Sequence, residues 1–164
     1  MSGKIHRYLG GDHQRLDALL ARALDDPENI DGTAYGQFRA GLLKHIGMVE
    51  KVLFPAGQKR RGAALPAAPK LRLDHGALAA LLVPSPTAPI VAAIRTILTA
   101  HNPIEEDPGG VYDTCEALAG ADADEILRQL QNFSEVRVLP HVDSPFVMDA
   151  TRRALARAGY DLEV

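Results

Sequence analysis

The sequence predicts an all-α fold, in which an up-down-up-down four-helix bundle has one or two extra helices at its C-terminal end. Two observations favour helices over strands. The chain of 164 residues has abundant alanine and leucine but only four Tyr, four Phe and no Trp, whereas strands depend on aromatic and β-branched side chains. Apolar residues also recur at intervals of three, four and seven, the period of an amphipathic helix, and strand-like alternation is nowhere convincing.

Four helical patterns predict the bundle. Each has one apolar stripe, and loops dense in Asp, Asn, Pro and Gly separate them. The patterns cover residues 12–25, 33–61 and 69–83, and the fourth starts near Pro89. Pro55 lies inside the second pattern, where we expect a kink because proline removes one backbone hydrogen bond. Helices joined by such short loops pack antiparallel to their neighbours.

Two further helices are expected after the bundle. A capping box that begins at Asp122 starts the first, which extends to about Leu139. Ser144, followed by proline, is a preferred N-cap for the second. We therefore expect a bundle over residues 1–120 and a C-terminal helical extension over residues 121–164 that packs on it.

Composition and charge argue against several classes of function. The net charge is −3 and no basic stripe interleaves with aromatic residues, so the sequence gives no support for nucleic-acid binding. No apolar run approaches the ~20 residues of a membrane span, and the N-terminal stretch lacks the apolar core of a signal peptide. Cys115 is the single cysteine, so an intrachain disulfide is impossible. These features predict a cytoplasmic protein.

One histidine lies in the apolar stripe of each predicted bundle helix. These are His13, His45, His75 and His101. They are separated by 32, 30 and 26 residues, about one helix plus one loop, so an antiparallel bundle can bring them to one depth. A single histidine on an apolar face is usually a hydrogen-bonded core residue. Four buried imidazoles without partners would cost about 1–3 kcal/mol each. Because imidazole is the commonest metal ligand, we interpret the four as a shared metal site.

Three glutamates are candidates for further ligands. Glu105 lies four residues after His101, about 40° round the helix, so both can face one centre. Glu106 lies about 140° round and reaches that centre only if the helix is distorted, for example by a π-bulge. Glu50 stands five residues after His45 among apolar neighbours, where a buried carboxylate needs a partner.

Other polar residues are expected around these ligands. Asp17 and Asp74 lie close to histidines in the chain and are expected to orient imidazole rings. His6 and His141 are expected at the surface or behind the ligands. A nitrogen-rich site with a few carboxylates suits iron better than zinc, manganese or copper, and there is no cysteine pair for a structural zinc site.

The stretch that follows His101 permits two interpretations. Asn102, Pro103 and Glu105 match the cap, the first-turn proline and the capping glutamate of a new helix. Because three other histidines point to a metal, we favour a helix that is kinked at Pro103 and still presents Glu105. The sequence Pro108-Gly109-Gly110 should end or break that helix soon afterwards.

These motifs resemble the hemerythrin-like (HHE cation-binding) domain family over residues from about 5 to 118. The matching pattern is Asp12-His13…Leu16, His45-Ile46…Glu50…Leu53-Phe54-Pro55, Asp74-His75, and His101-Asn102…Glu105-Glu106…Tyr112. In that family a four-helix bundle holds two non-haem irons, bridged by carboxylates and an oxygen atom. Members bind dioxygen or nitric oxide, sense oxygen or iron, or protect against oxidative and nitrosative stress.

The resemblance implies a di-iron centre with His13, His45, His75, His101 and Glu105 among its ligands, and zinc or manganese as substitutes for iron. Two positions depart from the family pattern. Val49 stands where the family usually has a glutamate, and Ala79 stands where the oxygen carriers have a further histidine. One of the two irons would then have fewer nitrogen ligands than in the oxygen carriers of the family. The expected role is therefore the sensing or detoxification of dioxygen, nitric oxide or peroxide. We expect at most weak redox activity and no classical enzyme catalysis.

The missing glutamate at Val49 leaves two arrangements open. Either the helix is distorted near Gly47 so that Glu50 turns inward, which we favour, or Glu105 or Glu106 bridges the metals alone. Two other functions compete with the hemerythrin-like one. A ferritin-like oxidase would need Glu-x-x-His pairs on two helices, and the sequence has none. A metal-free interaction or regulatory module, with the histidines as core residues, is the alternative.

Overall fold

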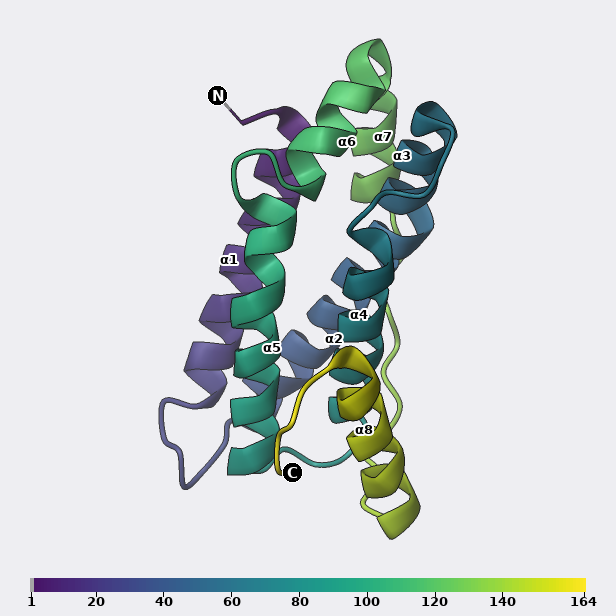
Figure 1. The fold of residues 1–164 in the computed structure, drawn as a ribbon. Helices are drawn as coiled ribbons and strands as arrows, with labels where there is room; N and C mark the ends of the chain where they lie inside the picture. The colour runs from purple at the N-terminus through teal and green to yellow at the C-terminus, as the bar shows by residue number, and fades with distance from the viewer. Residues whose placement is uncertain (1) are drawn as a thin grey trace. The chain divides into compact units, whose positions relative to one another are not determined.

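The computed structural model describes residues 2–164, which are helical or irregular and contain no β-strand (Figure 1). The predicted all-α class is confirmed. Two compact units are distinguished by their internal packing. Unit 1 comprises the chain up to Ala68 together with Asn102–Arg137, and unit 2 comprises Pro69–His101 together with Val138–Val164. Within residues 2–164, every helix is too short or too polar to span a lipid bilayer.

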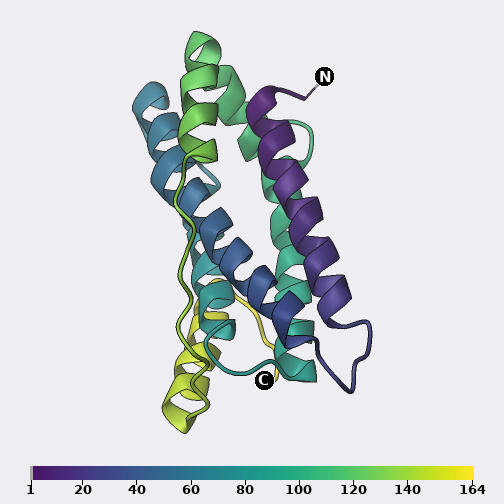
Figure 2. The same ribbon diagram turned by 180° about the vertical axis from the view of Figure 1, so that it is seen from behind.

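The helices of unit 1 are α1 (Lys4–Ala23), α2 (Gly32–Met48), the π-helix η1 (Val49–Leu53), α3 (Phe54–Arg61), α6 (Val111–Ala119), the short 3₁₀-helix η2 (Gly120–Asp122) and α7 (Ala123–Gln131). Helix α5 (Ala88–Glu106) begins in unit 2, and its last turn, from Asn102, belongs to unit 1. Helix α1 contacts α2, α6 and α7. Figure 2 shows α1 in purple and α2 in dark blue, joined by a loop. The predicted boundary at residue 120 does not coincide with this division, because α6 and α7 both belong to unit 1.

Helix α1 begins at Lys4, eight residues before the predicted start at residue 12. Its buried stripe runs from Ile5 through Leu9 to Leu20. The carboxylate of Glu116, on α6, accepts hydrogen bonds from the backbone N–H groups of Lys4 and Ile5 at 3.1 and 2.8 Å. A helix start leaves such N–H groups without intrahelical partners. Because this cap comes from a distant part of the chain, the local sequence does not reveal the early start.

The predicted helix over residues 33–61 is present as the continuous run of α2, η1 and α3. Asp31 caps it by accepting from the backbone N–H groups of Thr33 and Ala34, both at 3.0 Å. The distortion is a π-helical turn at Val49–Leu53, in which the N–H of Phe54 donates to the carbonyl of Val49. It ends two residues before Pro55, whose ring would clash in a regular helix with the backbone carbonyl four residues earlier, at Lys51.

Unit 2 contains α4 (Ala68–Leu81), most of α5, and α8 (Pro145–Ala158). Helix α8 packs on α4, since the hydroxyl of Thr151 donates to the carbonyl of Ala80 at 3.3 Å and Lys70 Nζ donates to the carbonyl of Ala158 at 3.0 Å. Ser144 caps α8 by accepting from Val147 N–H at 3.2 Å, as predicted. The predicted helices over residues 69–83 and from Pro89 are confirmed as α4 and α5.

Two further features of the helices differ from the sequence-based prediction. Helix α6 is not predicted by the apolar pattern. Helix α7 ends at Gln131, so the predicted end near Leu139 is wrong. The residues after α7 include Val136, Val138 and Pro140, which are poor helix formers. They form an irregular segment that leads to α8.

Candidate metal centre

Three buried ligand residues gather inside unit 1. They are His13 from α1, His45 from α2 and Glu105 from the last turn of α5, and one ligand atom of each lies within 4.8 Å of the others. Nε2 of His13 lies 3.1 Å from Oε2 of Glu105, and Nε2 of His45 lies 3.9 Å from the same oxygen. The two imidazole rings have centroids 4.5 Å apart. The relative exposures are 7%, 2% and 0%, so water has little access to this cluster.

In each of these two imidazole rings, a further carboxylate contacts the outer nitrogen, Nδ1. Nδ1 of His13 lies 2.9 Å from Oε2 of Glu106, and Nδ1 of His45 lies 2.8 Å from Oδ2 of Asp12. Each carboxylate accepts a hydrogen bond in the tautomer that has its proton on Nδ1, and this tautomer leaves Nε2 with a lone pair. The inward nitrogen, Nε2, is therefore the one available for a metal ion. Metal-ligating histidines are generally oriented by an acceptor on the other ring nitrogen.

The hydroxyl of Tyr112, on α6, lies between the three ligand residues. It donates to Oε2 of Glu105 at 2.7 Å and lies 3.2 Å from Nε2 of His13 and 3.1 Å from Nε2 of His45. Tyr112 is fully buried. Burial, with Glu105 beside it, raises the pKa of Tyr112 well above its ordinary value. Tyr112 belongs to the pattern of the resemblance, but sequence reasoning assigns it no role.

The proton count in this cluster leaves a place for one further proton or for a metal cation. The hydroxyl of Tyr112 has one proton, which it donates to Glu105. Nε2 of His13 and Oε2 of Glu105 would then both present lone pairs at a separation of 3.1 Å. An additional proton or a metal ion removes this repulsion. Burial alone would lower the pKa of His45, but its hydrogen bonds with Asp12 and Glu105 and their charges outweigh burial and raise it.

Unit 2 holds a second pair of buried histidines. His75 on α4 and His101 on α5 have ring centroids 4.8 Å apart, and each is 2% exposed. Nδ1 of His101 lies 3.1 Å from Oδ2 of Asp74, whose other oxygen accepts from Lys70 Nζ at 2.5 Å. Burial raises the pKa of Asp74, but the hydrogen bonds with His101 and Lys70 lower it further than burial raises it. Asp74 is therefore ionised and orients His101.

The remaining predicted site residues lie elsewhere. Glu106 contacts Nδ1 of His13 and is thus placed behind that ring, with its side chain 36% exposed. Glu50, in the first turn of η1, is half-buried and is not a member of the cluster formed by His13, His45 and Glu105.

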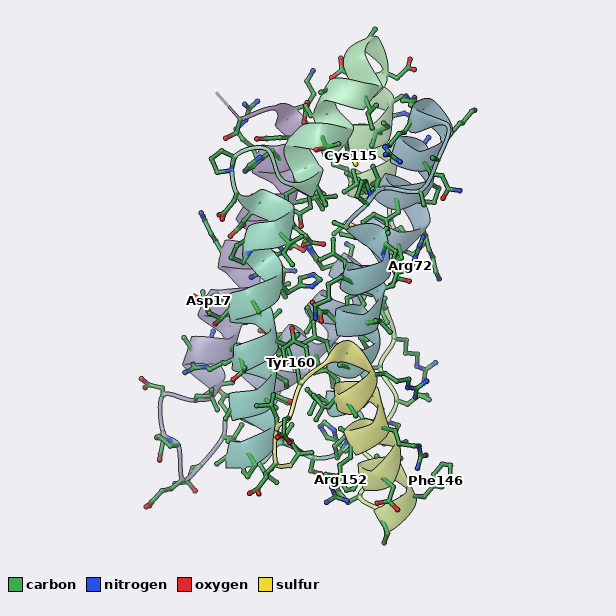
Figure 3. The ribbon with its side chains drawn as sticks, viewed as in Figure 1. Asp17, Arg72, Cys115, Phe146, Arg152 and Tyr160 are labelled. Atoms are coloured by element: carbon green, nitrogen blue, oxygen red, sulfur yellow. The ribbon has the colours of Figure 1, made fainter. Side chains whose placement is uncertain are left out.

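Three further polar residues were expected near the ligands or at the surface. Asp17 is exposed on α1 and does not orient a ring (Figure 3). His6 bonds Asp113 at 2.6 Å, and His141 is exposed, with Nδ1 3.3 Å from the carbonyl of Val83. Both histidines therefore lie outside the cluster in unit 1.

Comparisons of the chain with protein-family models, with curated proteins and with solved structures found no significant match. The resemblance to hemerythrin-like domains therefore stays a prediction from motifs.

The donor set in unit 1 fits a divalent first-row metal. Two imidazole nitrogens and one carboxylate oxygen approach a common point, which is the ligand set of non-haem iron(II) sites that keep open positions. His13, His45 and Glu105 are the residues that would hold such an ion. The buried surroundings and the acceptors at Nδ1 fix the rings in the orientation that coordination requires.

Proposed function

We propose that the chain is a non-haem di-iron binding protein of the hemerythrin-like type, which binds or reacts with dioxygen, nitric oxide or peroxide. One observation carries this proposal: Nε2 of His13, Nε2 of His45 and the carboxylate of Glu105 face one another in a buried site, with a carboxylate behind each ring. A cluster with this charge pattern is stabilised when a cation occupies its centre.

The first iron is assigned to His13, His45 and Glu105. The second is assigned to His75 and His101, because this pair is buried and His101 is oriented by Asp74 in the same manner as the rings of unit 1. The proposal includes the predicted up-down-up-down bundle, formed by α1, by α2 with α3, by α4 and by α5. Zinc or manganese would be substitutes for iron.

The bridging carboxylate at the second helix is assigned to Glu50, as predicted. The π-helical turn at Val49–Leu53 supports this assignment, because it supplies the distortion that would turn Glu50 relative to His45. Glu105 is the other candidate for a bridge. A bridging carboxylate offsets the repulsion between two cations held a few ångströms apart.

Iron held by His13, His45 and Glu105 would have open coordination positions, and it would supply there the binding of a small diatomic molecule or peroxide. The chain's own residues orient the ligand atoms and keep water away from them, since all four histidines and Glu105 are buried. The lack of a further histidine at Ala79 supports sensing or detoxification over reversible oxygen storage.

A metal-free helical module is the second candidate function. The hydroxyl of Tyr112 favours it, because this single group makes contacts of 2.7–3.2 Å with all three ligand residues of unit 1. In such a module the cluster would be a polar core network that specifies the fold rather than a metal site.

Elemental analysis separates the two functions. Protein from iron-replete cells, and protein reconstituted anaerobically with ferrous iron, should contain close to two irons per chain, and added nitric oxide should change its visible spectrum. Absence of iron from both preparations would reject the metal centre and favour the metal-free module. A value near one, abolished by His13→Ala and unaffected by His75→Ala, would restrict the site to unit 1.

A further inference from the structure

We infer that Tyr112 is a protein ligand of the metal in unit 1, so that its phenolate oxygen binds iron together with His13, His45 and Glu105. This inference rests on the proposed metal site. It concerns a residue type with different chemistry from the imidazoles and carboxylates that the motifs predict. It assigns the site a fourth protein donor and a second negative charge.

The position of the hydroxyl is the first argument. A ligand must lie where the other donor atoms converge, and the oxygen of Tyr112 lies 2.7 Å from Oε2 of Glu105 and 3.1 and 3.2 Å from the two Nε2 atoms. Donor atoms bound to one metal ion have separations of this order, because each lies roughly 2 Å from the ion. Four donors from four different helices therefore meet around one point in unit 1.

The connection between α5 and α6 fixes Tyr112 relative to Glu105. Helix α5 ends at Glu106, and a tight turn follows, in which Gly110 N–H donates to the carbonyl of Asp107 at 2.7 Å. Gly109 has a φ of 80°, which favours glycine. A Cβ atom at Gly110 would lie 2.8–2.9 Å from three backbone oxygens of the preceding turn. A larger residue at this position would disturb the tight turn that precedes Tyr112.

The packing of α6 on both sides holds the phenol in place. Asp113, the next residue, contacts His6 at 2.6 Å and accepts from Gly109 N–H at 2.9 Å. Cys115 packs against Gly57 of α3, where an added Cβ would lie 3.1 Å from its sulfur (Figure 3). Glu116 caps α1. Because these contacts anchor the helix, the backbone at Tyr112 is held beside the ligand cluster, and the phenol is fully buried there.

Coordination requires the loss of one proton and no change in oxidation state. Tyr112 would bind ferric iron as a phenolate beside His13, His45 and Glu105, and its hydroxyl proton would pass to solvent. Two anionic oxygens, from Glu105 and Tyr112, then face the metal. They stabilise the ferric ion more than the ferrous ion, because the attraction grows with the charge of the ion.

Spectroscopy of iron-loaded protein tests the inference. The protein is loaded with ferrous iron under argon and oxidised with ferricyanide, and its absorption and resonance Raman spectra are recorded. A phenolate bound to ferric iron should give a visible charge-transfer band whose excitation enhances tyrosine ring vibrations. Tyr112→Phe keeps the ring but lacks the oxygen, so it should lose the band, retain iron, and show a higher reduction potential. Tyr8→Phe, the same change on α1, should leave the spectrum unchanged.

The outcomes separate this inference from the proposed function. Iron bound at normal content without a tyrosinate band in the unsubstituted protein overturns the role of Tyr112 and leaves the metal site in place. A band that persists in Tyr112→Phe does the same. Protein that binds no iron overturns the proposed function and this inference together. The first spectrum is taken on unsubstituted protein, so the test stands even if the Tyr112→Phe chain fails to fold.

Discussion

Asp12 precedes His13 in the sequence but contacts His45 of the neighbouring helix, with Oδ2 2.8 Å from Nδ1. Unit 2 repeats the relationship: Asp74 precedes His75 and contacts Nδ1 of His101 at 3.1 Å. Each Asp-His pair thus supplies one inward imidazole and one carboxylate that orients the imidazole of the next helix. Both carboxylates have a lowered pKa in spite of burial, so both are ionised at neutral pH.

Asp12→Asn should weaken metal binding, although it removes none of the proposed ligand atoms. The amide cannot supply the negative charge that holds His45, and loss of such a partner typically lowers metal affinity by about 10–100-fold. Competition with a chelator of known affinity measures the change. Asp17→Asn, the same substitution at an exposed position of α1, is the control. Equal affinities for the two variants would contradict the role of Asp12.

His75→Ala and His101→Ala should each lose metal and lower the temperature of unfolding, because metal binding is coupled to folding. Iron content and thermal unfolding with and without iron provide the measurement. His141→Ala removes an exposed histidine and should change neither. If His141→Ala lost iron while His75→Ala kept it, the assignment of the second iron would be wrong.

The three glutamates should differ in their effect on iron content. Glu105→Gln should cause the greatest loss, because Glu105 is fully buried and contacts both histidines of unit 1. Glu106→Gln should cause less, since it acts through His13. Glu50→Gln should lower occupancy at one iron more than at the other, measured by Mössbauer spectroscopy. Full occupancy of both irons in Glu50→Gln would refute the bridging assignment.

Gly110→Ala should destabilise the protein by about 1–3 kcal/mol, the usual cost of forcing an extra group into a packed region. The added Cβ would lie 2.8–2.9 Å from three backbone oxygens. Gly11→Ala provides the matched control, because Gly11 lies within α1 and an added Cβ there meets no atom within 4 Å. It should instead stabilise the helix by about 0.5–1 kcal/mol. Urea denaturation of both variants compares the two effects.

Cys115 should be unreactive in the folded protein. It is 2% exposed, and burial raises the pKa of its thiol to about 12. The thiolate is the reactive form, so raising the pH from 7 to 9 should leave the folded chain unlabelled by a disulfide reagent. The same reagent should label the chain rapidly in concentrated urea. Rapid labelling of folded protein would show that α6 opens readily.

The long helices and the four core histidines can be predicted from the sequence, because both follow the helical period of the apolar residues. The hydrogen-bond partners of the imidazole rings cannot be predicted in this way. Asp17 lies four residues after His13, the expected spacing. Around helix α1, however, the buried Leu16 and Leu20 lie on one side of His13 and Asp17 lies on the other, so Asp17 is exposed. Asp12 contacts a ring on another helix, and no local pattern predicts which helix that is.

Two other features show the limits of local reasoning. The helix distortion expected near Gly47 is present, but it lies at Val49–Leu53. Gly47 instead allows close packing of Phe133, since an added Cβ would lie 2.8 Å from that ring. Tyr112 follows a turn of two glycines, and its position on Glu105 depends on how tightly that turn closes. Such distances arise from tertiary packing and have no signature in composition or spacing.

The division into two units determines which truncated fragments contain a complete unit and when each unit can fold during synthesis. Each unit is made of two separate stretches, and the chain passes between the units after Ala68, after His101 and after Arg137. A fragment that stops at residue 120 lacks α7 and α8, so it completes neither unit. The N-terminal helices must therefore wait for the last third of the chain before unit 1 closes. Contacts that join such distant segments form slowly, and slow closure prolongs the exposure of apolar surface in the partly synthesised chain.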